Sequence, residues 1–258
     1  MVKIQAIRSG DAVDNDGQLL STFLVNDQIA IDAAALGTMV SAAVQAQITA
    51  VFLSHCHMDH VATLPIFLEQ RFFFAAGELT VYAHQASITA LREHLFNDVL
   101  WPDLFRIQAE ENLELCRFRS MTVAESVQCN GLSVSAIPMN HTVPTLGFLV
   151  EAPEGSVAFV SDTQYDHQWI QSLHDAANLR CLFVECTFPN RLQTLSQDSK
   201  HMTPADIHQL VEQWRGPLPR VVITHSKPAF FDEVSEELSG LVGDACEMVS
   251  TAITYEFD

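Results

Sequence analysis

The chain has 258 residues, 48% of them hydrophobic, and its 13 Lys and Arg against 32 Asp and Glu give a formal net charge of −19. This length and apolar content exclude intrinsic disorder and predict one globular domain over residues 1–258 with a sizeable core. The negative charge argues against general nucleic-acid binding and against attraction to membranes, because phosphate backbones and anionic lipids repel such a surface.

Five short apolar runs along the chain each end in an ionisable residue. The runs are rich in Val, Ile and Phe, which predicts strands that are buried on one or both faces. In chain order they end at Asp32, His55, Asp162, Glu185 and His225. Because α/β proteins place their chemistry at the ends of strands along one edge of a sheet, this recurrence is the first functional signal.

Amphipathic helices are predicted between these strands. In residues 86–100, apolar side chains through Val99 recur at helical spacing before a Trp-Pro pair ends the segment. Another helix is predicted to begin at Pro204, with Thr203 as its N-cap. Strands mixed with amphipathic helices throughout the chain predict an α/β layered protein.

The cysteines and the N-terminus predict a cytoplasmic protein. The six cysteines show no C-x-x-C spacing in a chain too long to depend on disulfides, so we expect free thiols. The N-terminal stretch reaches charged residues and glycine before any apolar run that is long enough for a signal peptide. No segment has the ~18 apolar residues of a membrane span.

The segment His-Cys-His-Met-Asp-His at residues 55–60 carries the strongest chemical signal. It places three imidazoles and a carboxylate within six residues, directly after a predicted strand. In a tightly turning loop, these side chains can point toward two neighbouring centres. Imidazole and carboxylate together suit zinc, manganese or iron. The segment therefore predicts a metal site.

This segment resembles the H-x-H-x-D-H motif of the metallo-β-lactamase superfamily, whose fold is an αββα sandwich that holds one or two metals at one edge. The surroundings of His141, Asp162 and His225 are similar to the later motifs of that superfamily, and the resemblance extends from about residue 23 to residue 227. Each of these three residues alone also fits a turn or a core position. As a set, in this order, they favour metal binding.

The resemblance implies two divalent metal ions, with zinc favoured and manganese or iron as alternatives. One ion would be bound by His55, His57 and His141. The other would be bound by Asp59, His60 and His225. Asp162 would bridge both ions, and Asp32 would support the cluster from outside the ligand set. The remaining histidines are predicted to be structural or on the surface: His84, His94, His167, His174 and His208.

Four longer stretches resemble class II cyclic-nucleotide phosphodiesterases: residues 91–104, residues 185–190 (ECTFPN), residues 201–204 (HMTP) and residues 221–228 (VVITHSKP). Cleavage of a phosphodiester expels a sugar alkoxide, which a positioned histidine can protonate, so His201 is the candidate general acid. Glu185 would hold the His201 ring in the required tautomer. Asp59 is assigned to the catalytic set as well as to the metal. Thr63 occupies a position where the family usually has glycine.

The resemblance favours a dinuclear-metal phosphodiesterase that hydrolyses a 3′,5′-cyclic nucleotide such as cAMP, or a similar small anionic phosphodiester, through a hydroxide bridging the metals. A tRNA 3′-processing endoribonuclease is one alternative, although the chain lacks a basic arm to hold RNA. Hydrolysis of a lactone, thioester or β-lactam is another, and it would leave His201 without a role. A non-catalytic metal-binding scaffold is the third. Because superfamily members often dimerise, a homodimer is compatible with the sequence.

Overall fold

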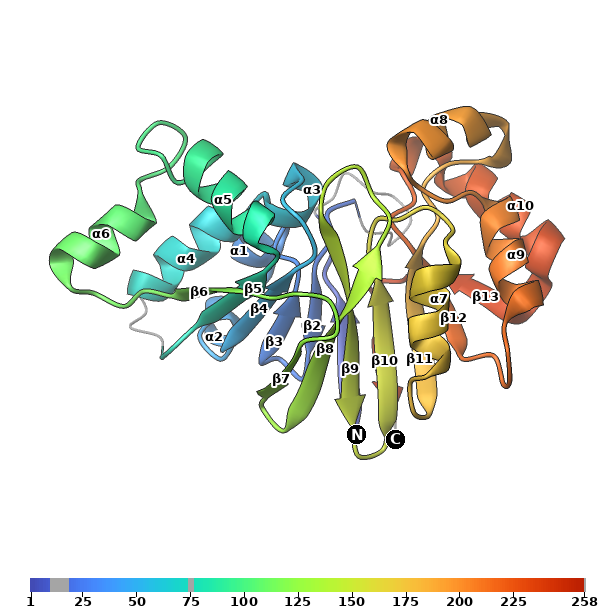
Figure 1. Ribbon diagram of the computed structural model, residues 1–258, viewed down its shortest axis with the longest axis horizontal. Helices are drawn as coiled ribbons and strands as arrows, with labels where there is room; N and C mark the ends of the chain where they lie inside the picture. The colour runs from blue at the N-terminus through green and yellow to red at the C-terminus, as the bar shows by residue number, and fades with distance from the viewer. Residues whose placement is uncertain (10–18, 74–76, 258) are drawn as a thin grey trace.

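Two seven-stranded sheets form the centre of the computed structural model, which describes residues 1–9, 19–73 and 77–257 (Figure 1). In spatial order, the first sheet consists of β14 (Thr254–Phe257), β1 (Val2–Ala6), β2 (Phe23–Val25), β3 (Ile29–Ile31), β4 (Ala50–Leu53), β5 (Thr80–Ala83) and β6 (Arg117–Ser120). The second sheet consists of β13 (Cys246–Met248), β12 (Arg220–Thr224), β11 (Leu179–Glu185), β10 (Gly155–Val160), β9 (Thr145–Ala152), β8 (Leu132–Met139) and β7 (Ser126–Cys129). Strands β3 to β6 and β10 to β13 pair in parallel, and the other neighbours are antiparallel.

Helices cover the outer face of each sheet, which confirms the predicted αββα sandwich (Figure 1). The first sheet is accompanied by α1 (Leu36–Met39), α2 (Ala42–Gln45), α3 (Met58–Val61), α4 (Leu64–Phe73), α5 (Gln85–His94) and α6 (Leu104–Glu111). The second is accompanied by α7 (His167–His174), α8 (Gln193–Ser199), α9 (Pro204–Gln213) and α10 (Phe231–Val242), with short 3-10 turns at Asn190–Leu192, Pro228–Phe230 and Gly243–Ala245.

Aromatic side chains fill the space between the two sheets. The rings of Phe159 and Phe183 stack with centroids 5.1 Å apart, and Phe23 packs against both. Phe148 lies in the same layer and is fully buried, so it belongs to the core as the sequence predicts. Burial of this apolar layer holds the two sheets face to face and fixes the relative positions of their edges.

Helices α1 and α4 approach each other closely at Gly37. A Cβ atom at this position would lie 2.6 Å from the carbonyl oxygen of Thr63 and 2.7 Å from the backbone nitrogen of Phe67. The hydroxyl of Thr63 accepts a hydrogen bond from the Gly37 N–H at 2.8 Å and donates to the Ala33 carbonyl at 3.2 Å. Thr63 therefore anchors the chain directly after residues 55–60.

Of the two helices predicted from the sequence, one is observed at its predicted start and the other is shorter than predicted. Helix α9 begins at Pro204 as predicted, and the Asp206 carboxylate accepts hydrogen bonds from Thr203 N–H and Oγ–H at 2.8 Å each. The helix predicted over residues 86–100 ends at His94, and Val99 is 83% exposed instead of facing the core.

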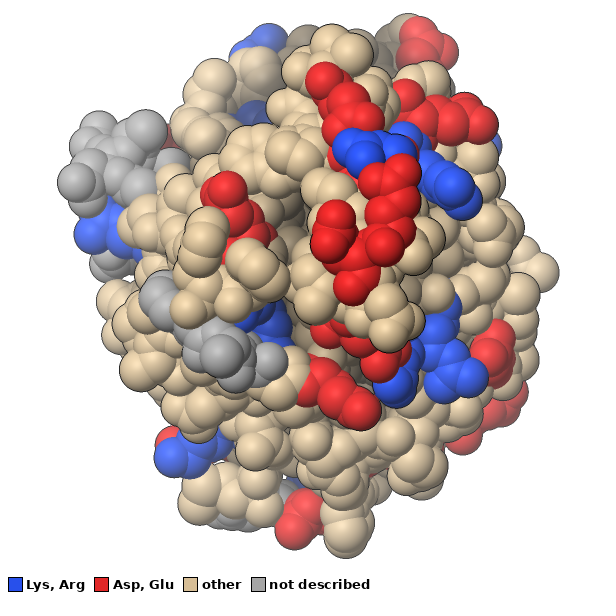
Figure 2. Space-filling view, turned by 90° about the vertical axis from the view of Figure 1, so that its left-hand side faces the viewer, with Lys and Arg blue, Asp and Glu red and all other residues tan. Residues whose placement is uncertain are grey.

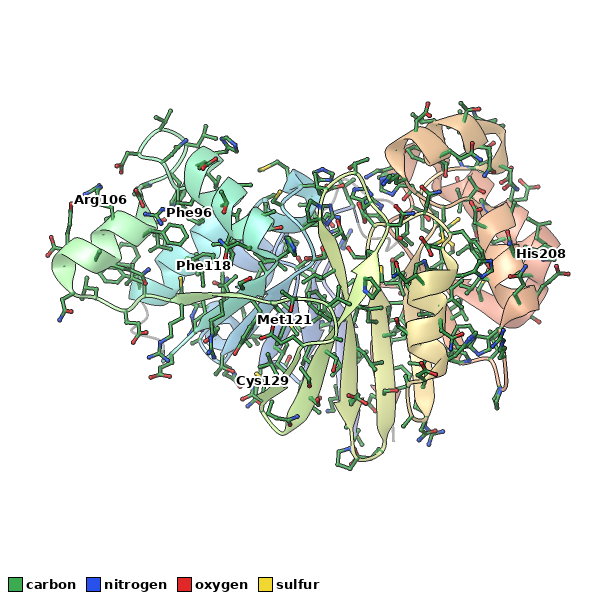
Figure 3. The ribbon with its side chains drawn as sticks, in the orientation of Figure 1. Phe96, Arg106, Phe118, Met121, Cys129 and His208 are labelled. Atoms are coloured by element: carbon green, nitrogen blue, oxygen red, sulfur yellow. The ribbon has the colours of Figure 1, made fainter. Side chains whose placement is uncertain are left out.

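Asn97 is the physical reason for the early end of α5. Its side-chain oxygen accepts hydrogen bonds from the N–H groups of Val99 and Leu100, so it closes a turn that competes with the helix. Phe96 still reaches the core and packs against Phe105 and Phe118 (Figure 3).

All six cysteines are unpaired thiols, as predicted. Burial raises the pKa of Cys116 and Cys181 to about 12, so both thiols stay protonated at neutral pH. Among the helices that the structure describes, none is long and apolar enough to cross a membrane.

Candidate metal centre

Three histidine rings converge on one point at the shared edge of the sheets. Nε2 of His55 lies 3.0 Å from Nδ1 of His57, and Nε2 of His141 lies 3.3 Å from the same atom. Ligands around one ion with bonds of about 2.1 Å have separations of this size. Asp162 Oδ2 completes the group at 3.7 Å from His55 Nε2 and 3.9 Å from His141 Nε2.

A second group lies beside the first and contains Asp59, His60 and His225. Nε2 of His225 is 3.2 Å from Oδ2 of Asp59. The other carboxylate oxygen of Asp162, Oδ1, lies 3.3 Å from His60 Nε2 and 3.5 Å from His225 Nε2. Asp162 therefore faces both groups. The structure brings all seven predicted ligands together as His/Asp clusters that are consistent with a dinuclear metal site.

Strand ends deliver these side chains to one edge. Asp32 follows β3, and His225 follows β12, and both adopt left-handed backbone angles, with φ of 58° and 60°. Such angles are uncommon outside glycine but are tolerated by Asp and His more than by most residues. They end each strand abruptly. Asp162 lies two residues after the end of β10, and His57 stands at the N-terminus of α3.

Asp32 and Ser54 orient two of the histidines. Buried Asp32 accepts a hydrogen bond from Nδ1 of His60 at 2.7 Å and from the Ser54 hydroxyl at 3.0 Å. Because the Ser54 hydroxyl donates to Asp32, it accepts from Nδ1 of His55, also at 3.0 Å. Both rings therefore carry their proton on Nδ1, which leaves Nε2 of each free to bind a metal. The Asp32–Ser54 pair places Asp32 directly behind two of the predicted ligands, His55 and His60.

Glu185 and Thr187 do the same on the second sheet. Fully buried Glu185 accepts from His201 Nδ1 at 2.8 Å through one oxygen and from the Thr187 hydroxyl at 2.8 Å through the other. Thr187 in turn accepts from Nδ1 of His225 at 2.9 Å. The backbone N–H groups of Thr163 and Met202 also donate to Glu185. The Glu185–Thr187 pair therefore fixes the rings of His201 and His225.

One buried atom tests whether the site fits a metal. Within the part of the chain that the structure describes, Nε2 of His60 has no hydrogen-bond partner, although it lies 3.3 Å from an oxygen of Asp162. When Nδ1 carries the only proton, two lone pairs face each other, and a cation between them satisfies both. Burial lowers the pKa of His60, but the carboxylates of Asp162 and Asp32 outweigh burial and hold this pKa well above its usual value. The position therefore attracts positive charge, and the donor set fits divalent metals.

His201 lies at the rim of the clusters. Its ring is 11% exposed, stacks on the ring of His225 with centroids 5.3 Å apart, and places Nε2 4.0 Å from Asp162 Oδ2. Burial opposes the charged ring, but Glu185 raises the pKa of His201 above its usual value. His201 also forms a third group of ligand-type residues with Asp162 and His225. Its geometry thus fits a proton donor, with metal binding as the competing role.

The structure adds residues that the sequence analysis did not select. Ser54 and Thr187 are hydroxyl residues that each join a carboxylate to a histidine, and both lie within two residues of a predicted site residue. Lys200 donates from Nζ to the carbonyl of His141 at 3.1 Å and accepts from Nδ1 of His141 through its own carbonyl at 3.2 Å. Lys227 approaches Asp59 at 3.0 Å. Proximity in sequence to a predicted ligand was the available signal for all four.

The histidines predicted to be structural or on the surface stay outside these groups. His84 caps α5 by accepting from the Ala86 N–H, and the side chain of His94 is 78% exposed. His208 lies on α9, away from the clusters, and pairs with Glu212 at 3.5 Å (Figure 3). The aromatic ring of Phe188 lies near the site, with its centroid 5.8 Å from that of His201.

Comparison with known protein families decides the family. Residues 30–226 match a sequence model of the beta-lactamase superfamily domain, and this range contains every predicted ligand. The chain belongs to the metallo-β-lactamase superfamily. The matched range begins in β3 and ends just after His225, so it contains strands of both sheets and all seven predicted ligands.

Within the superfamily, the chain is distantly similar to cyclic-nucleotide phosphodiesterases. It is 27% identical over 210 residues to a probable 3′,5′-cyclic-nucleotide phosphodiesterase of Yersinia pestis, covering 71% of this chain and 58% of the relative. It is 30% identical over 95 residues to 3′,5′-cyclic-nucleotide phosphodiesterase 1 of Saccharomyces cerevisiae, covering 35% of this chain and 24% of the relative. The chain thus spans little more than half the length of the first relative and about a quarter of the second.

The fold is shared with solved structures. Unliganded yeast PDE1 superposes with a TM-score of 0.78 at 15% identity, covering 98% of both chains. At this identity, the likeness shows the fold alone. It places both seven-stranded sheets and their flanking helices in the arrangement of the superfamily.

Proposed function

We propose that this chain is a metal-dependent hydrolase that cleaves small phosphodiesters, with a 3′,5′-cyclic nucleotide as the favoured substrate. The observation that carries the proposal is the Glu185–His201 hydrogen bond of 2.8 Å beside the two clusters. A proton donor at this place can speed expulsion of a sugar alkoxide about 10²–10⁴-fold, and His201 is held there by a buried carboxylate. The distant sequence similarity to cyclic-nucleotide phosphodiesterases supports the same substrate class.

Different residues of the chain have different roles in the proposed reaction. Divalent ions, zinc by preference, supply Lewis acidity toward the phosphate and lower the pKa of water when bound by the two clusters. The Glu185 carboxylate favours the charged form of His201, in which Nδ1 donates to Glu185 and Nε2 also carries a proton that it delivers to the leaving oxygen. Glu185 is fully buried and has all its oxygens occupied, so it positions His201 and does not contact substrate.

An RNA-processing activity has less support from the surface. Figure 2 views the end of the molecule formed by α5 and α6, where acidic and basic side chains are interspersed. Arg106 there is paired with Asp98 at 3.2 Å and Glu110 at 2.7 Å, and Arg117 is paired with Glu114. Arginines that are already paired with carboxylates contribute little to holding a phosphate backbone.

A substrate panel tests the proposal. Metal-loaded protein is assayed on 3′,5′-cyclic AMP, 2′,3′-cyclic AMP, bis(p-nitrophenyl) phosphate, a tRNA precursor and a lactone, and its metal content is measured in parallel. We expect turnover of small phosphodiesters and none of the lactone. Specific cleavage of the tRNA precursor without activity on cyclic nucleotides would replace the proposal by the endoribonuclease. Metal-loaded protein without any turnover would favour the non-catalytic scaffold.

A further inference from the structure

Two of the three lysines in this acidic chain lie beside the candidate metal centre. Lys200 stands next to the His55, His57 and His141 group, and Lys227 stands next to the Asp59, His60 and His225 group. The third, Lys3, lies on β1 and pairs with Glu256 at 3.7 Å. The two lysines at the site differ in how their ammonium groups are engaged.

The ammonium group of Lys200 is engaged in hydrogen bonds to other atoms of the protein. Nζ donates to Asn140 Oδ1 at 3.0 Å and to the carbonyl of His141 at 3.1 Å. The backbone carbonyl of Lys200 also accepts a hydrogen bond from Nδ1 of His141. Lys200 therefore bonds both the backbone and the ring of this histidine. Lys200 therefore serves as a positioning residue for His141.

The ammonium group of Lys227 points to the open side of the second cluster. Nζ lies 3.0 Å from Asp59 Oδ2 and 3.5 Å from His225 Nε2, and its side chain is 31% exposed. An ammonium has three N–H donors, so donors remain after the bond to Asp59. The base of the side chain is fixed, because the Lys227 carbonyl accepts from the Phe230 N–H at 2.8 Å and Pro228 follows. Lys227 thus presents a partly exposed, anchored cation where a substrate would reach the cluster.

We propose that Lys227 binds a phosphate oxygen of the substrate and selects anionic phosphodiesters over neutral esters. The inference rests on the proposed function, because it names a further substrate contact at the same site. Asp59, Asp162 and Asp32 gather negative charge at the centre of a chain whose net charge is −19. A diester anion entering this site gains an ion pair with Lys227 as well as a hydrogen bond from it, whereas a neutral ester gains the hydrogen bond alone.

The test compares Lys227→Met with the matched control Lys3→Met, which removes the same charge from a distant, exposed position. Metal content is measured first, and binding of inorganic phosphate to the metal-loaded proteins is then measured by calorimetry. We expect Lys227→Met to keep the metal content of the unmodified protein and to weaken phosphate binding about 10- to 100-fold, the size of one hydrogen bond to a charged group. Lys3→Met should leave both quantities unchanged.

A second measurement separates charge recognition from general damage. The kcat/KM values for bis(p-nitrophenyl) phosphate and for the neutral p-nitrophenyl diethyl phosphate share a leaving group and differ by one charge. Lys227→Met should reduce the diester value about 10- to 100-fold and change the triester value less than twofold, and Lys227→Arg should restore part of the loss.

Three results would overturn the assignment of Lys227. They are phosphate binding within twofold of the unmodified protein, loss of metal in Lys227→Met, or an equal loss on the diester and the triester. Failure of the proposed function looks different. In that case the unmodified protein turns over neither substrate, while the calorimetric comparison still decides whether Lys227 binds phosphate.

Discussion

The Asp32–Ser54 pair and the Glu185–Thr187 pair form the same hydrogen-bonding arrangement on opposite sheets. Each joins a buried carboxylate to a hydroxyl, and each accepts the Nδ1 protons of two imidazoles. The two pairs hold histidines with different predicted roles. The pair on the first sheet holds two predicted metal ligands, His55 and His60, at Nδ1. The pair on the second sheet holds one predicted ligand, His225, together with the proposed proton donor, His201.

This difference shows how one local arrangement serves two kinds of chemistry. A fixed Nδ1 proton leaves Nε2 of a histidine as a lone pair in a neutral ring and as a donor in a charged ring. For His55, burial lowers the pKa well below its usual value and favours the lone pair that a metal needs. For His201, Glu185 outweighs burial and raises the pKa, which favours a proton on Nε2. The direct partners of these two rings also differ, because Nδ1 of His55 bonds a hydroxyl and Nδ1 of His201 bonds a carboxylate.

Removal of Asp162 should have the largest effect, because this carboxylate faces both clusters. We expect Asp162→Ala to reduce metal content from about two ions per chain to one or none and to abolish turnover. Elemental analysis of reconstituted, folded protein measures the change. An unaltered content of two ions would show that the clusters do not depend on a shared carboxylate.

The His201→Ala substitution tests the role assigned to the second pair. Metal content should stay unchanged, and kcat on cyclic nucleotide should fall about 10²–10⁴-fold with little change in KM. The loss should be smaller for bis(p-nitrophenyl) phosphate, because p-nitrophenolate leaves without a proton. If metal is lost together with activity, His201 is a ligand and both pairs serve the same purpose.

Replacing the carboxylate of Asp32 or of Glu185 by its amide should affect metal affinity and kcat to different degrees. Asp32→Asn should weaken metal affinity about 10- to 100-fold, because the partner of His60 loses its charge. Glu185→Gln should lower kcat more than it lowers metal affinity, since it acts first on His201. Competition with a chelator and steady-state kinetics measure the two quantities, and similar effects from both variants would remove the distinction.

The smallest effect is expected from the helix that follows His201. Thr203→Ala removes the hydroxyl bonded to Asp206 and should lower the free energy of unfolding by about 1 kcal/mol while kcat stays near that of the unmodified protein. Denaturant unfolding measures this change. His208→Ala, on the same helix, should change stability by less than about 0.5 kcal/mol and provides the baseline. A large kcat loss in Thr203→Ala would mean that the helix cap, and not Glu185, positions His201.

The first sheet was easier to predict than the second. Residues 55–60 gather four ligand-type side chains in one loop after a strand, so the residue types alone indicate a metal. On the second sheet, Asp162, Glu185 and His225 come from separate strands that lie far apart in sequence. The parallel register brings them together, because Val160 pairs with Val184 and Glu185 pairs with Thr224. The apolar runs marked those residues as the polar ends of strands, but only the resemblance to a family gave them roles before the register was known.

Two kinds of feature could not be predicted from the sequence. Ser54 and Thr187 are common hydroxyl residues whose role depends on a carboxylate 22 residues away in one case and two residues away in the other. The early end of α5 depends on a turn closed by Asn97, which competes locally with an otherwise helical spacing of apolar residues. In both cases, hydrogen bonds of short polar side chains decided the outcome, and hydrophobic spacing carries no information about them.

The contact between Gly37 and Thr63 implies epistasis between these two positions. The Gly37 N–H reaches the Thr63 hydroxyl only because residue 37 has no side chain to hold the helices apart. A change of Thr63 to glycine in this background would leave that buried N–H without its partner, and a larger residue at 37 would separate the helices whatever stands at 63. Relatives with glycine at position 63 must therefore satisfy this N–H by another route, and the two positions should change together over the history of the family.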